Sequence, residues 1–83
     1  KNYAKQYRHF KGGLYNFICA ARLESDPDTI MIVYTAADGS YWTRPEQVFF
    51  EQITHQGQTL QRFTPVPDRR EQTRRGENRT GVW

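Results

Sequence analysis

The sequence predicts a mostly β fold: a small antiparallel barrel of about five strands with one short helical turn near residues 46–51. Short stretches of alternating hydrophobic and polar residues are separated by Gly, Pro or Asp-Gly turns, which is typical of antiparallel strands. Aromatic residues make up 14% of the 83-residue chain and all hydrophobic residues only 36%. This composition favours a compact core of Phe, Tyr and Trp. A chain of this length suits one domain, because it buries only about 60% of its unfolded surface.

The first part of the chain is expected to form a short strand and then a long one. Residues 7–10 form the short strand, and Lys11-Gly12-Gly13 supplies a turn, since glycine tolerates unusual backbone angles. Residues 14–23 form the long strand. Its alternate side chains make one unbroken apolar face: Tyr15, Phe17, Cys19, Ala21 and Leu23. That face is predicted to be buried, with Cys19 as an inert thiol that has no disulfide partner.

The middle of the chain predicts a hairpin. The composition of residues 24–28 predicts a polar loop, and the β-branched, apolar run from Thr29 to Ala36 predicts the central strand. The Asp38-Gly39 pair favours a tight turn. Residues 29–36 are therefore expected to pair antiparallel with residues 41–44.

The second half predicts a helical turn followed by another hairpin. Pro45 suits the first turn of a helix, and Glu46 complements the positive end of that turn. Residues 53–55 and 59–63 flank a Gly-containing turn and are expected to pair as the last strands. Five short strands with one helical turn are typical of an SH3-like barrel.

The composition changes after residue 67, so the sequence divides into a domain of residues 1–67 and a tail of residues 68–83. Residues 68–78 hold no apolar side chain, which predicts disorder. The tail carries five arginines against three acidic residues, so most of the net charge of +3 lies there. The longest apolar run is far shorter than the ~20 residues of a membrane span. With its lone cysteine, the protein is expected to be soluble and cytoplasmic.

Several blocks of sequence carry a family resemblance: Tyr7-Arg8-His9-Phe10-Lys11-Gly12-Gly13-Leu14-Tyr15, Trp42-Thr43-Arg44-Pro45, Phe49-Phe50-Glu51 and Arg62-Phe63. Through these blocks the chain resembles the small bacterial domains known as domain of unknown function 1653 (DUF1653), over about residues 7–66. The resemblance implies the same SH3-like fold. The resemblance assigns no catalytic residues to this chain.

The same blocks hold the candidate site residues. On an extended strand, alternate side chains share a face, so Tyr7, His9 and Lys11 are predicted to line one surface. By the same alternation Trp42 lies beside Arg44, and Tyr34 is expected at the same end of the barrel. Such an aromatic and cationic row suits an anion, a planar ring or a nucleotide. The predicted ligand-binding residues are Tyr7, His9, Lys11, Tyr34, Trp42 and Arg44.

Structural roles are the alternatives for these residues. Trp42 can instead belong to the core. His9 can instead hydrogen-bond to a neighbouring backbone group while Lys11 is solvated at a turn. Arg44 can instead pair internally with Glu46, Glu51 or a backbone carbonyl.

The pattern favours a non-catalytic binding module for a peptide, protein or nucleotide-like ligand. No metal or cofactor is expected, because His9, His55 and Cys19 lack metal-ligand spacing. The alternative is binding of single-stranded nucleic acid, by the barrel or weakly by the tail arginines Arg69, Arg70, Arg74 and Arg75. A small enzyme with a dimeric cleft is less favoured, since the acidic residues lie in loops and the tail. A monomer or weak dimer without membrane contact is expected.

Overall fold

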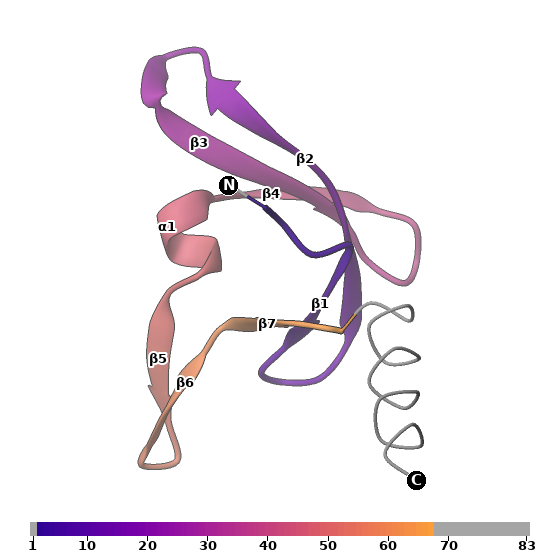
Figure 1. The fold of residues 1–83 in the computed structure, drawn as a ribbon, viewed down its shortest axis with the longest axis vertical. Coiled ribbons are helices and arrows are strands. Elements are labelled where there is room, and N and C mark those ends of the chain that lie inside the picture. The colour runs from indigo at the N-terminus through magenta and orange to yellow at the C-terminus, as the bar shows by residue number, and fades with distance from the viewer. Residues whose placement is uncertain (1, 68–83) are drawn as a thin grey trace, which may run out of the picture.

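The computed structural model describes residues 2–67, and within them it has seven strands and one short helix (Figure 1). A five-stranded antiparallel sheet has the order β4-β3-β2-β1-β7, and β5 and β6 form a separate two-stranded sheet. The elements are β1 (Gln6–His9), β2 (Leu14–Leu23), β3 (Asp26–Thr35), β4 (Tyr41–Pro45), α1 (Glu46–Phe49), β5 (Gln52–His55), β6 (Gln58–Gln61) and β7 (Phe63–Pro65). The prediction of a mostly β, antiparallel fold with one short helix is confirmed. The larger sheet does not close into a barrel, since β4 and β7 form its two edges.

The long strand β2 has the predicted bounds, but its apolar face is buried only in part. Tyr15 and Phe17 are half-buried, whereas Cys19 is an exposed, free thiol and Leu23 is 38% exposed. The pairing of β2 with β3 shifts register between Phe17 and Cys19, and the pairing of β2 with β1 reaches only Asn16. The predicted burial of Cys19 is therefore wrong, because the bulge and the short neighbour leave the outer part of β2 uncovered.

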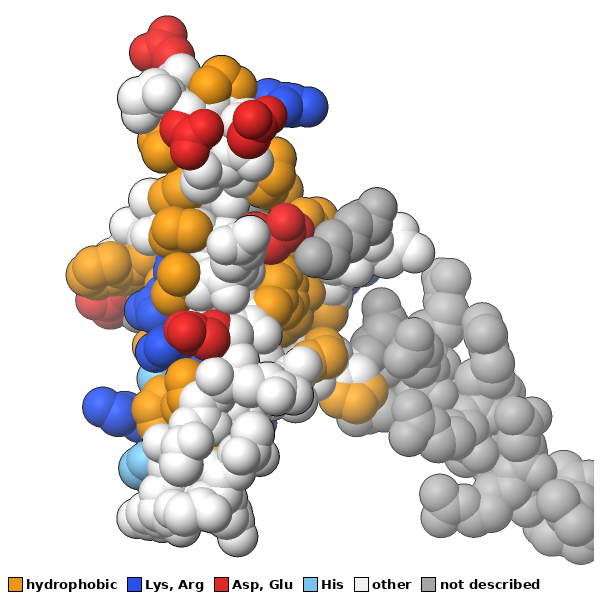
Figure 2. Space-filling model, turned by 90° about the vertical axis from the view of Figure 1, so that its left-hand side faces the viewer, with side chains coloured by type: hydrophobic (Ala, Val, Ile, Leu, Met, Phe, Trp, Pro, Cys, Tyr) orange, Lys and Arg blue, Asp and Glu red, His pale blue; other side chains and the backbone are white. Residues whose placement is uncertain are grey.

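Strand β3 begins three residues earlier than the sequence predicts, at Asp26, so the polar loop is shorter than residues 24–28. Pro27 is tolerated there because its backbone faces no partner in β4, whose pairing with β3 starts at Met31. The predicted hairpin of β3 and β4 is confirmed, with Tyr34 opposite Trp42. Figure 2 shows acidic side chains gathered at the end of the molecule that holds the β2–β3 turn.

The second predicted hairpin is formed by β5 and β6, but β6 ends before Phe63. The Arg62 N–H donates to the Glu51 carbonyl oxygen, and the Arg62 carbonyl accepts from Phe10 N–H. These bonds redirect the chain, so Phe63 begins β7 and pairs with β1. The expectation that the last strand ends near Phe63 is wrong for this reason.

The core is small and aromatic, as the composition predicts, but it does not contain Trp42, which is 56% exposed. Its buried side chains are Tyr7, Ile32, Tyr34, Phe49 and Phe63. The rings of Phe49 and Phe63 stack with centroids 4.1 Å apart and an interplanar angle of 2°, and Tyr7 meets Phe49 edge-on at 5.1 Å. Helix α1 lies within the predicted residues 46–51 and places Phe49 against the sheet.

The predicted tail of residues 68–83, with its arginines, lies outside the described residues. Within residues 2–67, no helix has the length and hydrophobicity that a membrane crossing needs.

Candidate functional site

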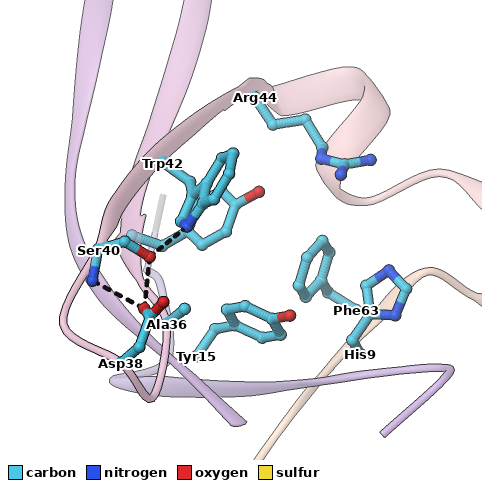
Figure 3. A pocket seen from close by; sticks show the side chains of 9 residues that line it. His9, Tyr15, Ala36, Asp38, Ser40, Trp42, Arg44 and Phe63 are labelled. Atoms are coloured by element: carbon cyan, nitrogen blue, oxygen red, sulfur yellow. Dashed lines mark hydrogen bonds between the residues drawn. The ribbon is translucent and has the colours of Figure 1, made fainter. Parts of the chain in front are cut away.

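A pocket of about 280 Å³ opens where the β3–β4 hairpin faces the strands β1, β2 and β7 (Figure 3). Its lining is mainly aromatic, with charged side chains at its ends. The lining residues are His9, Tyr15, Tyr34, Ala36, Asp38, Ser40, Trp42, Arg44 and Phe63. Residues far apart in the sequence therefore meet in one concave surface, which is the usual form of a small-ligand site.

Buried aromatic rings close the bottom of the pocket. Phe63 is 1% exposed and Tyr34 is 5% exposed, and their ring centroids lie 5.6 Å apart. Tyr15 meets both rings edge-on, at 5.5 and 5.6 Å. These residues belong to the core or pack against it, so the core itself forms a rigid base under the pocket.

Trp42 forms an exposed wall that is held in place by hydrogen bonds. Its side chain is 56% exposed. The indole Nε1–H donates to the Ser40 hydroxyl over 2.7 Å, and that hydroxyl donates to the Asp38 carboxylate over 2.6 Å. The Ser40 backbone N–H also donates to Asp38, over 3.0 Å. The two bonds from Ser40 lower the pKa of Asp38, so the carboxylate stays charged and the chain of bonds fixes the indole.

Arg44 points across the pocket without a carboxylate partner among the described residues. Its guanidinium lies 5.7 Å from the centroid of the Phe63 ring, a cation–π contact. The acidic residues that the sequence offered as partners are engaged elsewhere: Glu51 pairs with Arg62 at 3.0 Å, and Glu46 accepts a hydrogen bond from the Tyr3 hydroxyl. The guanidinium donors of Arg44 are thus available to a ligand.

His9 lies on the same side of the pocket as Arg44 (Figure 3). Its ring packs 4.9 Å from Phe63, and its Nδ1 accepts the backbone N–H of Lys11 over 3.2 Å. Burial lowers the pKa of His9, and the cations of Arg44, Arg62 and Lys11 lower it further. The imidazole is therefore mainly neutral at pH 7, with its proton on Nε2 because Nδ1 is an acceptor.

The pocket brings together four of the six predicted residues: His9, Tyr34, Trp42 and Arg44. Tyr7 shares the inner face of β1 with His9, as the alternation predicts, but it is 3% exposed and its hydroxyl accepts the Ala4 N–H. Strand β1 ends at His9, so alternation does not extend to the next predicted residue. Lys11 lies in the following loop, outside the pocket lining.

The sequence reasoning missed five lining residues: Tyr15, Ala36, Asp38, Ser40 and Phe63. The position of Ser40 could have been predicted, because Ser40 continues the alternation that places Trp42 and Arg44 on one face. Asp38 belongs to the recognised turn, and an Asp two residues before a Ser is a common local hydrogen-bonding pair. Phe63 gave no such signal, because only the β1–β7 pairing places it beside His9.

The titratable residues do not form a metal centre within residues 2–67, where no group of three or more His, Cys, Asp or Glu side chains comes together.

The fold and pocket define a small antiparallel β domain with an aromatic, partly cationic pocket. The chain belongs to the family described as "Protein of unknown function (DUF1653)", which matches residues 5–65. The family resemblance read from the sequence is thus confirmed. No curated protein and no solved structure matches the chain.

Proposed function

We propose that this domain is a non-catalytic binding module whose pocket holds the planar ring of a nucleotide-like molecule or a peptide side chain against Trp42. The observation that supports this most strongly is the state of Trp42. More than half of its side chain is exposed, yet the hydrogen bond to Ser40 holds its orientation. An indole that only filled the core would be covered by other side chains.

The energetics favour such a role. Stacking of an aromatic ring on a base contributes about 1–3 kcal/mol, a value that already includes the apolar surface that the ring covers. Ordering a free side chain on binding costs about 0.5–1.5 kcal/mol. The Asp38–Ser40–Trp42 hydrogen bonds reduce this cost, because the indole is already ordered before the ligand arrives.

The test is a set of ¹H–¹⁵N NMR titrations of the full chain with nucleosides, nucleotides and short aromatic peptides. Shift changes are expected at the Trp42 indole and at pocket residues, and they should saturate. Trp42→Ala should weaken binding about 5- to 150-fold, the loss of one stacking contact. Tyr41→Ala is the matched control, because Tyr41 is the neighbouring aromatic, 71% exposed, and outside the pocket lining.

Two results would contradict the proposal. One is the absence of pocket shifts with every compound at millimolar concentration. The other is an equal loss of affinity in Trp42→Ala and Tyr41→Ala, which would show that the pocket is not the site.

We also propose that the domain acts in the cytoplasm, as a monomer or weak dimer. The single cysteine supports this compartment, because proteins of oxidising compartments more often hold pairs of cysteines that form disulfides.

A further inference from the structure

We infer that the ligand of this pocket carries a phosphate next to its planar ring, and that Arg44 and His9 bind this phosphate. The inference rests on the proposed binding function and names the ligand class as a mononucleotide. Its basis is the uneven distribution of charge and donors around the pocket.

Arg44 provides the main contact. Its guanidinium is anchored over the Phe63 ring at 5.7 Å and has no carboxylate partner among the described residues. A planar guanidinium offers parallel N–H donors, which match the oxygens of a phosphate in a bidentate pair. An arginine that served only the fold would be expected to use these donors within the protein.

His9 adds a hydrogen-bond donor at the Arg44 end of the pocket, and Lys11 adds a positive charge close enough to His9 to lower its pKa. The Nδ1 atom of His9 is occupied by the Lys11 backbone, which leaves Nε2–H as the donor for a ligand. The Lys11 ammonium lies 5.7 Å from the Phe10 ring centroid and, like Arg44, has no carboxylate partner within residues 2–67. Arg62 differs, since Glu51 neutralises it. Two unneutralised cations near His9 suit the double charge of a phosphate monoester.

The opposite end of the pocket carries the Asp38 carboxylate (Figure 3). Ser40 directly precedes β4, and the four residue steps from Ser40 to Arg44 along the strand separate the Asp38 turn from Arg44 by roughly 13 Å. A negative group at one end and cations at the other orient a ligand that is itself anionic at one end. The phosphate therefore lies toward Arg44, and the ring lies between it and the Asp38 turn, against Trp42.

The size of the pocket favours a mononucleotide over a longer strand. Its volume of about 280 Å³ is just below the range of about 300–1,000 Å³ usual for small-ligand sites, which leaves room for one nucleotide and not for several.

The experiment compares adenosine, AMP and inorganic phosphate by isothermal titration and NMR on the full chain. AMP should bind about 10- to 100-fold more tightly than adenosine, which is the effect of charge-assisted hydrogen bonds. Arg44→Gln should bring the ratio of the AMP affinity to the adenosine affinity close to one. Arg8→Gln is the control: it removes the same charge from an exposed residue of β1 that lies outside the pocket, and it should leave the AMP preference intact.

The outcomes separate this inference from the proposed function. If adenosine and AMP bind equally at the Trp42 indole, the binding module stands and the phosphate site is refuted. If Arg8→Gln and Arg44→Gln weaken AMP binding equally, AMP is attracted by the overall positive charge and not by Arg44, and the phosphate site is again refuted. If a trinucleotide without a terminal phosphate binds more tightly than AMP, the ligand is a nucleic-acid strand and the mononucleotide inference is refuted. If no ring compound binds, both proposals fail.

Discussion

Replacing either partner of the Phe49–Phe63 stack with leucine tests how far this ring pair stabilises the domain. The pair lies at the centre of the core, 0% and 1% exposed, with parallel rings 4.1 Å apart. An aromatic pair contributes about 0.5–1.5 kcal/mol beyond the surface it buries. Each leucine variant also loses some packing, so each should lower the unfolding free energy by about 1–2 kcal/mol. Alanine would remove about 3–5 kcal/mol, a large share of the roughly 3–10 kcal/mol expected for a domain of this size.

The assay is urea unfolding of the wild type, Phe49→Leu, Phe63→Leu and the double variant. Because the first leucine already abolishes the ring pair, the double variant should lose about 0.5–1.5 kcal/mol less than the sum of the single losses. Tyr41→Leu is the control at a 71% exposed position and should change stability by less than about 0.5 kcal/mol. Single losses that add within about 0.3 kcal/mol would refute the role assigned to the stacked rings.

Two further predictions concern the β5–β6 turn and His9. Gln56 adopts a left-handed backbone (φ 51°) before Gly57 (φ 77°). Gln56→Asn should therefore raise the unfolding free energy by about 0.5–1 kcal/mol in urea unfolding, because asparagine tolerates this conformation better than glutamine. Gln58→Asn in β6 is the control and should not stabilise the domain, so equal effects of the two substitutions would contradict the turn assignment. The pKa of His9 is lowered in the folded state, so the unfolded state takes up its proton first and stability should fall as the pH drops below about 6.5. His9→Asn, which keeps an acceptor for Lys11 N–H, should show a smaller fall in melting temperature between pH 7 and pH 5, and parallel curves would refute the assignment.

Much of the fold was predictable from local signals. The Asp38-Gly39 pair fixed the β3–β4 hairpin, and Pro45 with Glu46 marked the start of α1. The double glycine marked the β1–β2 turn, where both residues have positive φ. Each of these signals acts over a few residues, so the sequence alone is sufficient to read it.

The features that the sequence left open depend on long-range pairing. The position of Phe63 follows from the β1–β7 register, and the exposure of Cys19 follows from a bulge in β2. Alternation correctly placed Trp42 and Arg44 on one face. It gave no basis for placing Lys11, because β1 ends at His9 and Lys11 lies in the following loop, outside the pocket lining. Whether an alternating face meets the core or solvent depends on its neighbours in space.

The most direct test of the account is the Trp42 indole N–H signal during titration of the full chain with AMP, followed in the wild type and in Arg44→Gln. The account predicts a saturable shift of this signal in the wild type and binding about 10- to 100-fold weaker in the variant. A wild-type indole signal that does not move at millimolar AMP, adenosine or aromatic peptide would contradict the claim that this pocket binds a planar ligand.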